Sequence, residues 1–267
     1  MSGWLPAGIE PFAGITAWAV AGVFAAHALG CFIRGAFGFG SNVPIVILTT
    51  FLLGPHHAVL LALLTTFVAQ LNLIPQGLRT ADWQVARPLI AGLVAGTAFG
   101  TWLFTVMAAD WLVLVLGVVL TVILLMDTLR LVQRLTARID LRSKRLAAGF
   151  SLIGGTVGGL SGAGAFYFLV VYMKQACASA QALRGTNVVL SMIVMCMRMT
   201  VVVAAGLVTP SLLAEGLLLT PLVFAAAWYG AHVFHTSTPE RFYAALQVLL
   251  FAGALALVLR GIGRIGW

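Results

Sequence analysis

Long apolar runs separated by short polar stretches dominate the chain. A membrane-spanning helix needs about 20 consecutive apolar residues, and seven segments reach that length. Three shorter apolar segments flank glycine-rich stretches, which is typical of helices interrupted inside a membrane protein. We therefore expect an all-α integral membrane protein with about eight to ten transmembrane or half-membrane helices. The full-length segments are approximately 13–33, 56–77, 84–107, 111–131, 180–206, 210–233 and 241–260, and the shorter ones are 42–54, 147–160 and 163–176.

The glycine spacing occurs once in each half of the chain. A shift of 124 residues places four glycines of the first half on glycines of the second. Each half contains five apolar segments, an odd number, so consecutive halves must enter the membrane with opposite orientations. We predict two inverted repeats with broken helices, about 12–131 and 146–262, joined by a basic loop at 132–145, in a single membrane domain over 1–267. The matched glycines are Gly30 with Gly154, Gly35 with Gly159, Gly38 with Gly162 and Gly40 with Gly164.

Composition and charge support the same class. Hydrophobic residues make up 61% of the 267 residues and charged residues only 8%, whereas about one-quarter of a soluble domain is charged. Much of the surface must therefore face lipid. The net charge is +8, and six basic residues lie within 130–145 between apolar segments. This pattern follows the positive-inside rule and places the loop in the cytoplasm; it does not indicate nucleic-acid binding.

The strongest local motif is Gly35-Ala-Phe-Gly-Phe-Gly-Ser-Asn-Val-Pro44. Glycines permit a backbone break, Ser41 or Asn42 suits an N-cap position, and Pro44 suits the first helical turn. A helix should therefore begin near Ser41. Its free N–H groups and positive dipole end would favour an anion, so Gly38 and Gly40 are also candidate contacts.

The second half repeats this arrangement at Ser161-Gly162-Ala-Gly164, before a helix predicted to start near Ala165. Two helix N-termini related by the repeat would form an anion site with little help from side chains. The alternative is that these glycines only allow helices to pack closely.

Charged and polar residues inside the apolar segments refine this hypothesis. Arg34 directly precedes the first glycine run and is the best candidate for a charged substrate contact. Arg184 begins a helix and could reach the site or the cytoplasmic surface, while Arg198 could serve as a structural tether. Thr186 and Asn187 add neutral polar groups. No carboxylate is clearly placed at the membrane midplane, which favours an anion over a cation.

Other reactive residues do not suggest a further site. His27 is expected to be a packed histidine. The cysteines Cys31, Cys177 and Cys196 lie in apolar surroundings without metal-ligand spacing and are interpreted as packing residues. No metal site and no cofactor are predicted. The N-terminus lacks a basic n-region, so we expect the first apolar run to remain a membrane helix.

The chain resembles the TauE/SafE family, the sulfite exporter family of bacteria. The resemblance rests on the Gly35–Pro44 motif, on Gly158-Gly-Leu-Ser-Gly-Ala-Gly164, on Ala182-Leu-Arg-Gly-Thr-Asn187 and on the two-half layout. It implies a multi-pass protein of the bacterial inner membrane that transports sulfite, sulfoacetate or related organosulfonates. The chain has Gly-Phe-Gly where the family often has consecutive glycines. The shift of 124 also places Leu60 to Leu63 opposite Arg184 to Asn187, so polar contacts are expected mainly from the second half.

We expect a secondary transporter, an exporter of small anions working by alternating access. An anion channel or an organic-acid permease of the same fold is the alternative. A membrane-embedded enzyme is disfavoured because the sequence contains no nucleophile–base or metal constellation. Coupling to protons or to another ion, and assembly as a homodimer, stay open.

Overall fold

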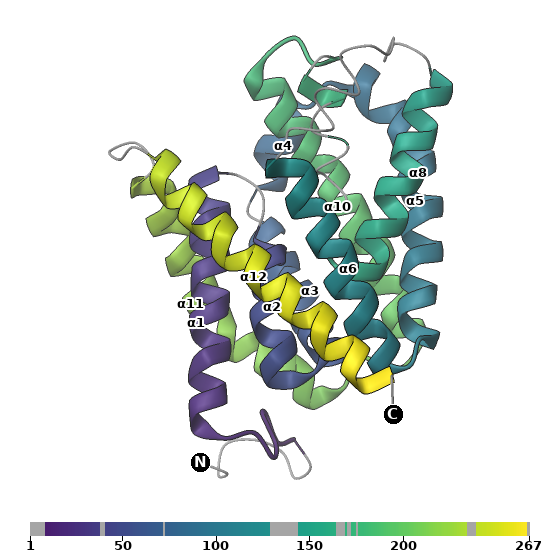
Figure 1. The fold of residues 1–267 in the computed structure, drawn as a ribbon. Helices are drawn as coiled ribbons and strands as arrows, with labels where there is room; N and C mark the ends of the chain where they lie inside the picture. The colour runs from purple at the N-terminus through teal and green to yellow at the C-terminus, as the bar shows by residue number, and fades with distance from the viewer. Residues whose placement is uncertain are drawn as a thin grey trace.

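The fold comes from a computed structural model that describes residues 9–37, 41–71, 73–128, 144–163, 169, 172–174, 176–233 and 239–265. Almost all of these residues are helical, and none of them forms a strand. The helices stand side by side as a bundle, with α12 crossing it obliquely (Figure 1). They are α1 Ala17–Phe37, α2 Asn42–Leu53, α3 Pro55–Leu71, α4 Ile74–Thr80, α5 Trp83–Val106, α6 Ala109–Thr128, α8 Lys144–Ser161, α10 Ala180–Ala204, α11 Pro210–Val233 and α12 Pro239–Ile265.

Five of the described helices are long and apolar enough to cross a membrane: α1, α5, α6, α10 and α11. A sixth span results if α3 and α4, which are bent by 63° at their junction, count together. Helix α12 covers the expected segment 241–260 but is not among these five. The shorter apolar helices are α2 and the part of α8 from Ala147 to Ser161, as the lengths of their apolar runs predict.

The distribution of polar and apolar side chains is that of a membrane protein. Large apolar side chains face outward, including Trp18 with 89% of its surface exposed and Trp228 with 70%. Charged side chains occur inside: Arg198 and Glu215 are each only 2% exposed. In a soluble protein such extensive apolar exposure would mark an interaction surface, and here it is suited to contact with lipid.

Three helix pairs form the main interfaces: α1 with α11, α5 with α8, and α6 with α12. The α5–α8 contact is a glycine seam. A Cβ placed on any seam glycine would lie 2.1–2.6 Å from an atom of the facing helix, so only glycine allows the two helices to approach this closely. The seam consists of Gly92, Gly96 and Gly100 on α5 and Gly155 and Gly159 on α8.

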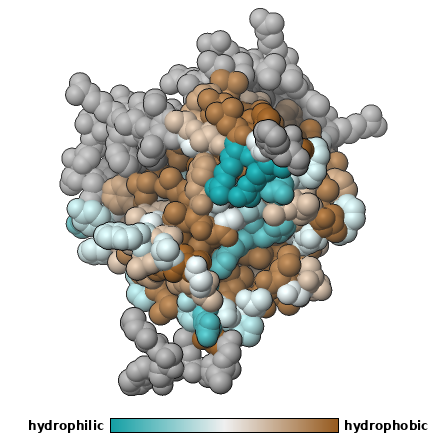
Figure 2. Space-filling view, turned by 60° about the horizontal axis from the view of Figure 1, so that its bottom comes forward, coloured by the Kyte–Doolittle hydropathy of each residue, from teal (hydrophilic) through white to brown (hydrophobic). Residues whose placement is uncertain are grey.

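Several helix ends meet at one end of the bundle, drawn at the bottom of Figure 1. The α2–α3 turn at Gly54 lies here, together with the start of α11 and the C-terminal end of α12. Asp110 of α6 pairs with Arg264 of α12 at 3.3 Å. Figure 2 brings this end forward and shows hydrophilic surface gathered near its middle, with apolar surface around it.

Candidate functional site

The first helix break lies where the glycine motif predicts it. Helix α1 ends at Phe37 and α2 begins at Asn42, with Gly38 and Gly40 outside the described residues. Ser41 occupies the N-cap position, but its side chain forms no capping hydrogen bond. Its hydroxyl instead donates to Asn42 Oδ1 at 3.0 Å and accepts from Arg34 Nη1 at 3.4 Å. The side chain therefore leaves the first-turn N–H groups of α2 uncapped.

Helix α8 ends at Ser161, at the predicted second break. Gly162 adopts a left-handed backbone conformation, with φ of 72°, and its N–H donates to Gly158 O at 3.0 Å. This is how helices commonly terminate at glycine. The Ser161 hydroxyl oxygen accepts from Ala163 N at 3.2 Å and stays within its own turn. Gly164 and the predicted helix start near Ala165 lie outside the described residues.

One hydrogen bond joins the two breaks. Asn42 Nδ2 donates to Gly162 O at 2.6 Å, across 120 residues of sequence. Together with the contacts of Ser41, it gives a continuous polar chain from Arg34 through Ser41 and Asn42 to Gly162. The tertiary fold thus brings together four of the residues that the sequence singles out.

Arg198 of α10 joins this group from the other half. A Cβ on Gly162 would lie 3.2 Å from Arg198 Nη1 and 3.4 Å from Nη2, so the guanidinium lies directly against the second break. Arg198 Nε and Nη2, and Arg34 Nε, are buried without a hydrogen-bond partner in the described part of the chain. An arginine inside a membrane costs about 2.5–3.5 kcal/mol on insertion scales. These arginines therefore need a counter-charge.

The carboxylates of Glu215, Asp110 and Asp82 do not supply that counter-charge. Glu215 is paired with His57, and Asp110 is paired with Arg264. Asp82 is the N-cap of α5, where its Oδ1 accepts from Gln84 N and Val85 N. In the described residues, the chemistry at the two breaks is therefore that of N–H donors and positive charge, which suits a small anion.

The structure separates the other predicted contacts from this cluster. Arg184 lines a shallow pocket between α4 and α10, together with Gly77 and Thr80. Thr186 Oγ1 accepts from Asp82 N at 2.8 Å, which fixes the start of α5. These two residues therefore lie on the α4–α10 side of the bundle, outside the cluster at the breaks.

Asn187 is buried, and its Oδ1 has no partner among the described residues. It precedes Arg198 by eleven residues on α10, which corresponds to about 16 Å along the helix. Asn187 therefore lies well away from the Arg198 end of the cluster. The polar side chains that meet at the breaks are Arg34, Ser41 and Asn42 from the first half and Arg198 from the second.

Close packing explains some of the repeated glycines. A Cβ on Gly35 would lie 1.9 Å from Ala227 O of α11, and one on Gly159 would lie 2.6 Å from Thr97 O of α5. Both positions need glycine because another helix touches them. Gly162 differs, because its positive φ and its contact with Arg198 place it at the break itself.

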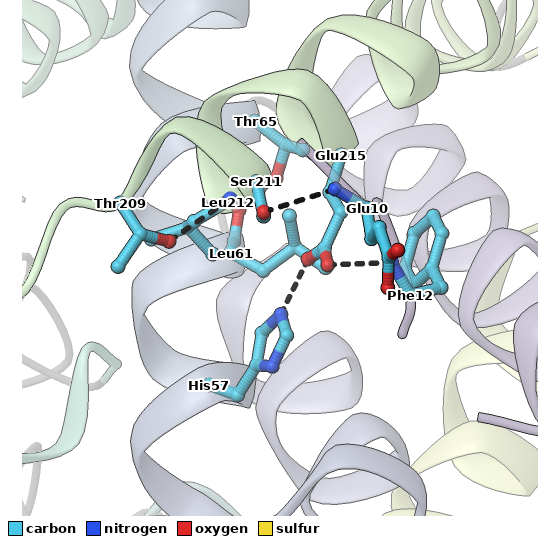
Figure 3. A network of polar contacts seen from close by, with 9 residues as sticks. All are labelled: Glu10, Phe12, His57, Leu61, Thr65, Thr209, Ser211, Leu212 and Glu215. Carbon is cyan, nitrogen blue, oxygen red and sulfur yellow. Dashed lines mark hydrogen bonds and ion pairs between the residues drawn. The ribbon is translucent and has the colours of Figure 1, made fainter. Parts of the chain in front are cut away.

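A second polar network, shown in Figure 3, has no counterpart in the sequence patterns. Glu215 Oε1 accepts from Phe12 N at 2.8 Å, and Glu215 Oε2 contacts His57 Nε2. Glu215 lies more than 150 positions from both of its partners, so no local motif could reveal this network.

The fold and the polar cluster around Arg34, Asn42 and Arg198 define a class: a multi-pass α-helical membrane protein in which helix ends meet at a polar centre lined by arginines. The chain belongs to the sulfite exporter TauE/SafE family, which it matches over residues 23–257. Comparison with curated proteins and with solved structures found no match.

Proposed function

We propose that the chain is a secondary transporter that exports small anions, such as sulfite, sulfoacetate or related organosulfonates, by alternating access. The observation that carries this proposal is the Asn42–Gly162 bond, which joins the two helix breaks between two arginines with unpartnered N–H groups. An oxyanion at this point would accept hydrogen bonds from both guanidinium groups. Such charge-assisted bonds are each worth about 1.5–3 kcal/mol.

Helix packing supports an inverted repeat. The shift of 124 residues carries α1 onto α8 and α5 onto α11. It therefore converts the α1–α11 pair into the α8–α5 pair, and the α6–α12 pair into itself. A pseudo-twofold relation between 12–131 and 146–262, within one membrane domain, predicts this exchange of partners.

The same arrangement would allow alternating access. Asn42 belongs to the first half, and Gly162 and Arg198 belong to the second, so the anion would be held between two bodies able to rock against each other. Loss of the anion would leave two like charges beside the helix breaks without compensation. The empty and loaded carriers would therefore favour different positions of the two halves.

An anion channel or an organic-acid permease of this fold is the second candidate, because family membership does not determine the mode of transport. Flux through a channel does not saturate readily and shows no counterflow. The matched family is named for sulfite export, so we propose a transport role without enzymatic activity, cofactor or metal. We place the protein in the bacterial inner membrane with the 132–145 loop in the cytoplasm.

The test is anion binding to the purified protein, measured by thermal shift with sulfite and sulfoacetate. A ligand that binds only the folded state raises the apparent stability. Arg34→Gln and Arg198→Gln should each weaken binding about 10- to 100-fold, because each removes a charge-assisted hydrogen bond of about 1.5–3 kcal/mol.

The matched control is Arg264→Gln, which removes an arginine whose side chain is 42% exposed and already paired with Asp110. It should leave binding unchanged. Saturable uptake with counterflow in proteoliposomes should distinguish a carrier from a channel. Wild-type affinity in both Arg34→Gln and Arg198→Gln would refute the proposed site.

A further inference from the structure

Glu215 is a buried carboxylate that the anion site does not use. It lies in the second turn of α11, and only 2% of its surface is exposed. Each of its oxygens has one partner: Oε1 accepts from Phe12 N and Oε2 contacts His57 Nε2 (Figure 3). An ionisable residue within a transmembrane helix is costly, and it usually marks an ion or proton pathway.

His57 connects this carboxylate to the solution. Its side chain is 33% exposed, whereas that of Glu215 is 2% exposed. The imidazole therefore lies between the protein surface and the buried carboxylate, at the end of the bundle where α3 and α11 begin. Imidazole is the side chain best suited to exchange protons near neutral pH.

In the described part of the chain, His57 is the titratable side chain that contacts Glu215. Glu10, on the segment before α1, lies beside the pair (Figure 3) and is exposed, while Asp110 and Arg264 at the same end of the bundle pair with each other. His56 faces away, because its Nε2 lies 3.3 Å from Phe104 O of α5. Helix α1 carries no charged residue in its first half, and α11 carries none besides Glu215 between positions 210 and 230. Gain of one proton by the His57–Glu215 pair would change the local charge by one unit.

Helix α3 links the pair to the anion site. Val59 follows His57 by two residues and is fully buried. A Cβ on Gly162 would lie 3.2 Å from Val59 Cγ1, the same distance as from Arg198 Nη1. The start of α3 thus touches Glu215 on one side and the second helix break on the other.

We propose that His57 and Glu215 form the proton-binding site that couples a proton gradient to anion movement. This inference rests on the proposed transport function. The pair carries a net charge of −1 when a neutral imidazole faces the ionised carboxylate. It is neutral when the imidazole holds a second proton. One proton enters from the outer solution at His57 and strengthens the contact between His57 and Glu215. This change shifts the start of α3 against Gly162. The proton leaves on the opposite side as the anion is exported.

The experiment uses proteoliposomes loaded with labelled sulfite or sulfoacetate, with and without an inward proton gradient. Wild-type efflux should rise with the gradient. Glu215→Gln keeps an acceptor for Phe12 N but cannot ionise, so it should lose this response while still binding the anion in the thermal-shift assay. Glu10→Gln, which neutralises an exposed carboxylate in the same region, should respond like wild type.

His57→Gln is the second variant, and it should also lose the gradient response because glutamine does not take up a proton. Its side chain is partly exposed, so this position should tolerate the substitution more easily than position 215. The proposal is overturned if wild-type efflux ignores the gradient or if Glu215→Gln keeps the full response. It is equally overturned if both variants fail to fold, since the pair would then serve stability alone. By contrast, wild-type protein that binds neither anion would refute the transport function itself.

Discussion

The glycine seam between α5 and α8 allows a quantitative prediction at Gly96. A Cβ at this position would lie 2.2 Å from Leu152 O and 2.9 Å from Thr156 N. Both atoms belong to the α8 backbone, so no side-chain rotation can relieve the contact. Ordinary contact begins at 3.4 Å, and Gly96→Ala must therefore push the helices apart by about 1 Å. Overpacking of this kind costs about 1–3 kcal/mol.

The measurement is the unfolding temperature in detergent, compared with Gly149→Ala on the same helix pair. Gly149 lies on α8, and a Cβ there meets nothing within 4 Å. Gly149→Ala should be neutral or stabilising by up to about 1 kcal/mol, because alanine is the better helix former. Gly96→Ala should unfold at a clearly lower temperature.

The two variants also separate packing from site effects. Helix α8 ends at the second break, so displacing it should weaken anion binding in Gly96→Ala but not in Gly149→Ala. If Gly96→Ala unfolds at the wild-type temperature, the close helix approach is wrong, and so is our reason for glycine at the seam.

Three further substitutions test other parts of the structure. Asn42→Ala removes the bond to Gly162 O and should weaken anion binding in the thermal-shift assay by about tenfold, the equivalent of one hydrogen bond. Thr186→Val removes the acceptor for Asp82 N; it should lower stability to chemical unfolding by about 1–3 kcal/mol without changing anion affinity. Arg264→Ala breaks an exposed ion pair with Asp110, and its free energy of unfolding should stay within about 1 kcal/mol of wild type.

Helix boundaries followed closely from the sequence. The segment expected at 84–107 is the helix Trp83–Val106, and the one expected at 210–233 is Pro210–Val233. This agreement has a simple cause, since a helix in a membrane must satisfy its own backbone hydrogen bonds over the whole apolar length. The start of α2 at Asn42 was likewise predictable, because glycines, a capping residue and Pro44 act locally.

The site residues were predictable only in part. Arg34, Ser41, Asn42 and Gly162 were indicated by their position beside the glycine breaks. Local sequence could not separate Arg184, which lines the α4–α10 pocket, from Arg198, which touches Gly162. Both are arginines on one apolar helix, and only the neighbouring helices distinguish them.

The sequence by itself determined that this chain is a helical membrane protein, where its first helix break lies and which family it resembles. These properties depend on apolar length and on local backbone preferences. Only the tertiary structure decided which glycines serve packing and which lie at a break, because that depends on the atoms of a facing helix. It also decided the Asn42–Gly162 bond and the His57–Glu215 pair. Such contacts join residues more than a hundred positions apart, and no periodicity in the chain encodes them.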